Sequence, residues 1–193
     1  MRFNPNQPAS RRIPVEPAEL AALQAFGQII GHDNVSAPVS ADFYAAAVTT
    51  SRPVDFRSAG PVELSLASVT PRPGRVHYME RHFLHTQTFI PLRGKPFVLV
   101  MAPPGDRDLP DLDLVRAFYF DGSAGFLMHI GTWHEFPFAL QADTDLVVIL
   151  SAQTTLDLKN RSEDGSEASG PDLQKLDIAA RTGVVLEFDL PHT

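Results

Sequence analysis

Prolines are the feature that most restricts how this chain can fold, because seventeen of them are spread along its 193 residues. Proline lacks a backbone N–H and has a fixed φ angle, so it interrupts helices and central strands and is tolerated in turns. Roughly twice the average share of proline therefore predicts short elements joined by many turns. The thirteen phenylalanines supply bulky side chains for a single core.

Apolar and polar residues alternate with a period of two in Val62–Val69, which is typical of a strand with one buried face. Residues 97–101 are apolar throughout, and Asp121-Gly122 is a strong hairpin signal. Many short strands with close turns predict an all-β fold, either an antiparallel β-barrel or a sandwich of jelly-roll type.

One amphipathic helix is predicted near the N-terminus, over residues 16–28. Leu20, Leu23 and Phe26 recur at a spacing of three residues, which places them on one helical face. Pro17 lies near the first turn, where a helix tolerates proline. This is the one helix that the sequence indicates clearly.

Composition excludes several classes of protein. The net charge of −7 and the lack of any basic stripe argue against a nucleic-acid partner. Without cysteine, disulfides and thiolate metal sites are excluded. The chain has no apolar run long enough for a membrane span, and its N-terminal arginines are not followed by the apolar segment of a secretory signal. We therefore expect a soluble, cytoplasmic protein.

Two polar stretches, residues 80–94 and 129–137, look like two halves of one small-molecule site. Glu80 and His82 are two residues apart, so both point to the same face of a strand, and Arg81 points to the other. His134 follows a glycine-containing bend in the second stretch. Two histidines and one oxygen ligand would leave open positions on a metal ion, as a catalytic site requires.

The spacing of these residues resembles the cupin motifs. Glu80-x-His82-x4-Gln87-x6-Gly94 is similar to the first cupin motif, normally His-x-His-x4-Glu-x6-Gly. Gly131-x-x-His134 is similar to the core of the second. Glu80 stands where a histidine is usual and Gln87 where a glutamate is usual, which implies weaker metal affinity than in a three-histidine cupin, or none.

In its finer detail the sequence resembles the ureidoglycolate lyases, a cupin family, over about residues 13–150. Residues 31–60 do not align. The residues that carry the resemblance are His77, Glu80, Arg81, His82, Thr86, Gln87, Phe89, Ile90, Pro91, Leu92, Gly94, Arg116, Ala117, Phe118, Gly122, Gly125, His129, Trp133 and His134, with Phe26, Gly27, Gln28, Ile29 and Ile30 near the N-terminus. We expect a single cupin domain over residues 1–193, with a family-like core (13–158), a polar loop (159–172) and a C-terminal extension (173–193).

The resemblance implies a homodimeric enzyme that cleaves (S)-ureidoglycolate to glyoxylate and urea in purine (allantoin) catabolism. It implies catalytic roles for Glu80, His82 and His134, with Glu80 as the preferred acid/base group. A divalent metal, Ni²⁺ or Mn²⁺, would be held by His82, Gln87 and His134. Without a metal, a histidine or Glu80 could serve as the base.

Other residues of the pattern are less specific. We expect substrate binding by Gln87, His129 and Arg116, although His129 could equally well only form a hydrogen bond within the bend. For the remaining histidines His32, His85 and His192 we expect structural or surface roles.

Two alternatives remain open on the sequence. One is a cupin enzyme that acts on another small hydroxy- or keto-acid, because a scaffold does not fix its substrate. The other is a non-catalytic cupin that binds a small molecule, a role that needs the pocket but not the acid/base pair.

Overall fold

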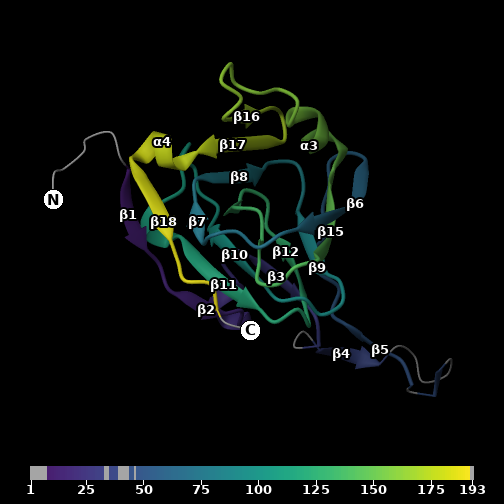
Figure 1. Cartoon of the computed structure of the whole chain (residues 1–193). Coiled ribbons are helices and arrows are strands. Elements are labelled where there is room, and N and C mark those ends of the chain that lie inside the picture. Colours follow the sequence, from purple (N-terminus) through teal and green to yellow (C-terminus); the bar gives the residue numbers. More distant parts are fainter. Residues whose placement is uncertain (1–7, 33–34, 39–43, 46, 192–193) are drawn as a thin grey trace.

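The computed structural model describes residues 8–32, 35–38, 44–45 and 47–191 (Figure 1). Short strands in mostly antiparallel sheets are the main regular structure of this part of the chain, and helices are few and short, which confirms the all-β prediction. Closure of these sheets into a cupin barrel stays a prediction. His192 lies outside the described residues.

Two larger sheets form the body of the molecule. The main sheet consists, in spatial order, of β16 (Ala168–Ser169), β17 (Leu173–Asp177), β8 (Tyr78–His82), β13 (Trp133–His134), β10 (Phe97–Ala102), β11 (Arg116–Phe120) and β2 (Val15–Pro17), with β14 (Phe138–Ala139) also paired with β10. The second sheet consists of β3 (Gly27–Ile30), β12 (Gly125–Met128), β9 (Thr88–Pro91), β15 (Thr144–Ser151) and β6 (Val62–Val69).

Smaller elements cover the body. A third sheet joins β1 (Ala9–Arg12), β18 (Val184–Glu187) and β7 (Arg75–Val76), so that the first and last strands of the described chain lie side by side in Figure 1. A separate pair, β4 (Val35–Pro38) and β5 (Thr49–Ser51), projects away from the body. The helical segments are α1 (Leu20–Leu23), α3 (Ala152–Asp157), α4 (Ile178–Thr182) and the 3-10 helix η1 (Leu112–Leu114).

Strand β10 shows how the layers are built. Its residues are buried throughout, and their side chains alternate between two apolar cores. Phe97, Leu99 and Met101 join a core to which the main and second sheets both contribute. Val98 and Val100 face the opposite side, where the third sheet covers the main sheet. A strand buried on both faces has to be apolar throughout, as the sequence indicates here.

The N-terminal helix is present but much shorter than predicted, because only Leu20–Leu23 is helical. On one side Pro17 belongs to β2, which pairs with β11, and on the other Gly27–Ile30 pairs with β12. A Cβ at Gly27 would lie 2.1 Å from the carbonyl oxygen of Leu127, so this close strand pairing requires glycine. Pairing in the sheets therefore overrides the helical periodicity.

The C-terminal segment is part of the main sheet. Strand β17 pairs with β8 along its whole length, from Leu173 opposite His82 to Asp177 opposite Tyr78. Within the described residues, none of the helices has the length and apolar character that a membrane crossing demands.

Candidate active site

Strand β8 sends Glu80 and His82 into the space between the two larger sheets. Met79 of this strand belongs to the core on the other side of the main sheet, so its even-numbered neighbours face inward. Arg81 points outward with Met79, and its guanidinium lies over the rings of Phe83 and Trp133. The opposite orientation predicted for Arg81 is confirmed.

The other half of the site comes from β13. His134 pairs directly with Glu80, and directly opposed residues of adjacent strands share one face of a sheet. The His134 Nε2 atom lies 3.5 Å from Glu80 Oε1, and the His134 and His82 ring centres are 5.3 Å apart. The Nδ1 atom of His134 lies 3.2 Å from the carbonyl oxygen of Thr132. The ring therefore directs Nε2 at the Glu80 carboxylate.

The side chain of His82 faces carboxylates with both nitrogens. Its Nε2 lies 3.9 Å from Glu80 Oε1, and its Nδ1 lies 3.9 Å from Asp172 Oδ2. Burial first, and then the neighbouring His134, lowers the pKa of His82 to about 3. The imidazole is therefore neutral at pH 7, which is the form that binds metals.

A second buried group adjoins the first through His82. His85 Nδ1 lies 3.0 Å from Asp172 Oδ2, and the His85 ring centre is 4.6 Å from that of His82. Asp172 also accepts hydrogen bonds from the Leu84 amide and the Thr154 hydroxyl. Burial alone would raise the pKa of Asp172, but these donors outweigh it and hold the pKa below its usual range. Of the structural or surface roles expected for His85, its burial fits the structural one.

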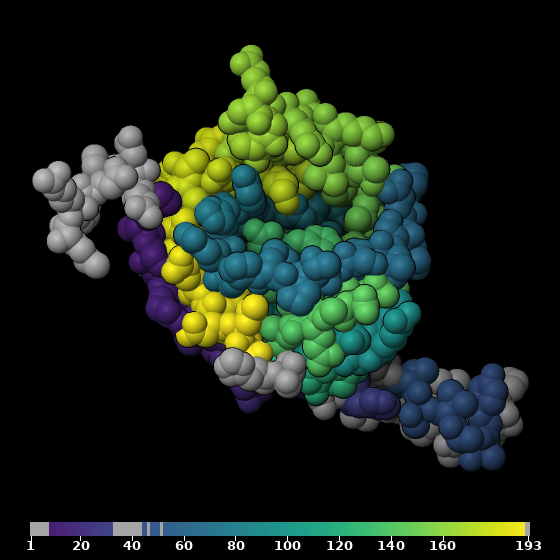
Figure 2. Space-filling view, viewed as in Figure 1, coloured from purple at the N-terminus to yellow at the C-terminus, as the bar shows by residue number. Residues whose placement is uncertain are grey.

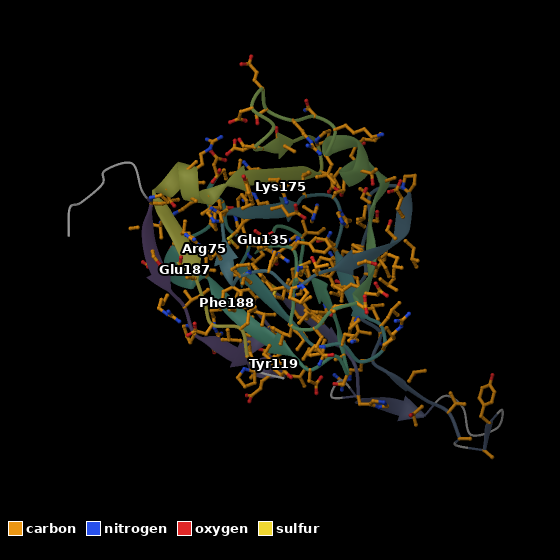
Figure 3. All side chains as sticks on the ribbon, viewed as in Figure 1. Arg75, Tyr119, Glu135, Lys175, Glu187 and Phe188 are labelled. Carbon is orange, nitrogen blue, oxygen red and sulfur yellow. The ribbon has the colours of Figure 1, made fainter. Side chains whose placement is uncertain are left out.

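Lys175 completes the charge arrangement around Glu80. It lies opposite Glu80 on β17, and its Nζ is 2.7 Å from Glu80 Oε2. Burial alone would raise the pKa of Glu80, but the His134 imidazole and the Lys175 ammonium outweigh it and hold the pKa far below normal. Figure 3 places Lys175 and Glu135 near the middle of one face, where Figure 2 shows the surface hollowed.

Buried polar atoms without a partner gather around these residues. In native proteins such atoms are few, and each costs about 1–3 kcal/mol. A cluster of them therefore indicates a site shaped for a ligand that supplies the missing contacts. In the part of the chain that the structure describes, these atoms are His82 Nδ1 and Nε2, His85 Nε2, Gln87 Oε1, Thr88 Oγ1 and His134 Nε2.

The residues present fit a divalent metal. Each of three buried residues, Glu80, His82 and His134, offers one ligand atom, and these three atoms lie within 4.8 Å of one another. Two imidazoles and one carboxylate form a ligand set that leaves open positions on the ion. This set contains Glu80 as its oxygen ligand, whereas the sequence suggested Gln87. Gln87 is buried with Oε1 unpartnered, and its role as a ligand stays a prediction.

The structure does not bring Arg116 and His129 into contact with this cluster. Arg116 shares the sheet face of His134, but its guanidinium pairs with the Glu16 carboxylate and lies over the ring of Phe118. His129 lies in the bend, where its amide donates to the carbonyl oxygen of Phe26. Substrate binding by either residue stays a prediction.

Sequence reasoning missed His85, Asp172 and Lys175 as members of this cluster. His85 follows β8 but belongs to neither cupin motif. Asp172 and Lys175 lie in the segment that the resemblance left out. Only the pairing of β17 with β8 brings them to Glu80 and His82. Leu173-Gln174-Lys175-Leu176 does not alternate between apolar and polar residues, so no periodic signal indicated this further sheet strand.

An all-β chain with a buried site of two histidines and one carboxylate is typical of proteins that bind or convert small molecules. Comparison with known proteins identifies the family within this class. A model of the ureidoglycolate lyase family matches residues 10–175. The ureidoglycolate lyase of Azotobacter vinelandii is 37% identical over 145 residues, covering 72% of this chain and 84% of the relative. That of Pseudomonas syringae pv. syringae is 31% identical over 148 residues, covering 72% and 82%. This chain belongs to the ureidoglycolate lyase family. The matched range includes both Asp172 and Lys175.

Proposed function

We propose that this protein is a lyase that cleaves (S)-ureidoglycolate to glyoxylate and urea in allantoin catabolism. The observation that carries the proposal is the buried set of Glu80, His82 and His134, with unpartnered imidazole nitrogens, in a chain of the ureidoglycolate lyase family. A neutral imidazole lone pair and a carboxylate held in place are the groups that proton transfer requires. The alternatives of another hydroxy- or keto-acid substrate, or of binding without catalysis, find no specific support.

The reaction breaks a carbon–nitrogen bond in a hemiaminal, in which one carbon carries a hydroxyl, a ureido nitrogen and a carboxylate. Without a metal, a neutral histidine or Glu80 would accept the hydroxyl proton, the C–O bond would become the carbonyl of glyoxylate, and the C–N electron pair would leave with urea. The departing nitrogen takes up one proton, so the proton removed from the hydroxyl balances the one added. His134, whose Nε2 lies 3.5 Å from Glu80 Oε1, would pass that proton on.

Glu80, His82 and His134 are the residues that would hold a divalent metal, for which we propose Ni²⁺ or Mn²⁺. Such an ion would supply Lewis-acid chemistry, which would lower the pKa of the substrate hydroxyl. Lys175 then holds Glu80 Oε2, which leaves Oε1 directed at the imidazoles.

The first test is release of urea and glyoxylate in equal amounts from (S)-ureidoglycolate by the purified protein. The R enantiomer is the matched control, because a site that fixes the hydroxyl and carboxylate should discriminate between the two. Failure to release urea from the S form under any metal condition would contradict the proposed activity.

Chelation should abolish most of this turnover. Metal ions supply several kcal/mol of stabilisation to such reactions, so we expect a decrease on the order of a hundredfold that added Ni²⁺ or Mn²⁺ reverses. Mg²⁺, which prefers oxygen ligands, is the control ion and should restore little. Turnover that is indifferent to chelator would contradict the metal's role and leave acid/base catalysis by the same residues.

We further infer that the enzyme acts as a cytoplasmic homodimer. The metabolic character of the family supports the compartment. An apolar outer face of the second sheet supports the dimer, because Leu64 and Leu66 on its edge strand β6 are 72% and 61% exposed. Val147 and Ile149 of β15 pair with these two leucines and extend the face.

Leu66→Asp should therefore shift the protein toward the monomer in analytical ultracentrifugation. A charge placed in an apolar contact loses its hydration, so the dimer is weakened while the folded monomer is not. Leu114→Asp is the control, since Leu114 is 51% exposed on η1. This variant should have the same oligomeric state as the wild type. An unchanged dimer in the Leu66 variant would rule out this face as the interface.

A further inference from the structure

A substrate with a carboxylate needs a cation at its site, and most nearby cations are committed elsewhere. Arg72 donates hydrogen bonds to the carbonyl oxygens of Phe136 and Pro137. Arg81 points to the opposite face of the main sheet, where it contacts Trp133. Arg116, the cation that the sequence suggested, is paired with Glu16.

Lys175 is the cation whose contacts place it at the cluster. Its side chain is 28% exposed and that of Glu80 is 9% exposed, so the lysine borders both the buried carboxylate and solvent. An ammonium group has three N–H donors. Among the described residues its one hydrogen bond goes to Glu80 Oε2, which leaves two donors for a further acceptor.

Lys175 also lines a separate pocket of about 220 Å³. The other side of this pocket is formed by the segment before β17, including Arg161 and Ser166, and Tyr78 of β8 borders it. Lys175 therefore belongs to both the pocket and the Glu80 cluster. A ligand anchored at this ammonium would reach the cluster with its uncharged end.

We propose that Lys175 is the receptor for the substrate's carboxylate, a role that rests on the proposed lyase function. The ammonium holds Glu80 with one N–H and offers the others to the carboxylate, and this orients the neighbouring hemiaminal carbon toward His82 and His134. Its charge also screens the bound anion from Glu80 and Glu135, which would otherwise repel it. Lys175 is thus a binding and positioning residue of the site.

Binding of oxamate, a small monoanionic carboxylate, and of its neutral analogue oxamide tests this role by calorimetry on the metal-loaded protein. Lys175→Met should weaken oxamate binding about tenfold to a hundredfold, the range for one charge-assisted hydrogen bond. Oxamide affinity should stay the same. Lys175→Arg should retain most oxamate affinity, and Lys159→Met, which removes an exposed lysine, should change nothing.

In kinetics, Lys175→Met should raise the KM for (S)-ureidoglycolate by a similar factor, with a smaller change in kcat. Equal oxamate affinity in wild type and Lys175→Met, including no binding to either, would overturn the inference. Parallel loss of oxamide and oxamate binding would show a merely structural role and also overturn it. Lysine-dependent oxamate binding in a wild type that releases no urea would instead refute the substrate and keep the carboxylate site.

Discussion

His134→Ala should lose roughly a thousandfold in turnover of (S)-ureidoglycolate while the protein stays folded. A positioned acid/base group contributes about 10²–10⁴-fold to such reactions. His134 is buried, its Nδ1 lies beside the Thr132 carbonyl oxygen, and its Nε2 lies 3.5 Å from Glu80. The variant keeps only His82 Nε2, 3.9 Å from the same carboxylate oxygen, and this more distant nitrogen should transfer the proton less effectively, so the loss should appear in kcat.

The control for this variant is His77→Ala, which removes a histidine from the segment just before β8. It should retain wild-type turnover, because His77 lies outside the cluster. Circular dichroism and thermal melting would establish that both variants are folded. Full activity in folded His134→Ala would refute the assignment of this site.

Asp157→Ala should lower the free energy of unfolding by about 3 kcal/mol, because it leaves several buried donors without an acceptor. Asp157 is buried at the end of α3 and accepts hydrogen bonds from the amides of Asp172 and Leu173 and from the Gln153 side chain. For a chain of this length the loss corresponds to a decrease of roughly 6–12 °C in Tm. Differential scanning calorimetry measures it directly.

The same substitution should impair catalysis, since Asp157 holds the backbone that carries Asp172 beside His82 and His85. Glu163→Ala is the control, because Glu163 is exposed in the loop between the two aspartates. Its Tm and turnover should match those of the wild type. A stable, fully active Asp157→Ala variant would show that this buried carboxylate does not organise the site.

Much of the site could be predicted from local spacing alone. Side chains two residues apart on a strand point to the same face of the sheet in any fold. The spacing of Glu80 and His82 therefore predicts that both point to one face. The glycine-containing bend before His134 likewise follows from local sequence. The fold class follows from alternation and from the frequency of proline.

The helix shows where such reasoning ends. Leu23 and Phe26 have helical spacing and both reach the core, but one turn of helix followed by a strand achieves the same burial. Pairing of Gly27–Ile30 with β12 satisfies the backbone of those residues in the sheet. A periodicity of only a few residues cannot distinguish these arrangements.

The sequence by itself therefore determined the class of fold, the two motifs and the common orientation of Glu80 and His82 on one strand face, because each depends on residues close together in the chain. Only the tertiary structure decided that Asp172 and Lys175 belong to the site and that Arg116 is held by Glu16. These contacts join residues that are distant in the sequence; Arg116 and Glu16, for example, are about a hundred positions apart. Strand order sets them, and strand order follows from burying both faces of the main sheet at once, which no local pattern encodes.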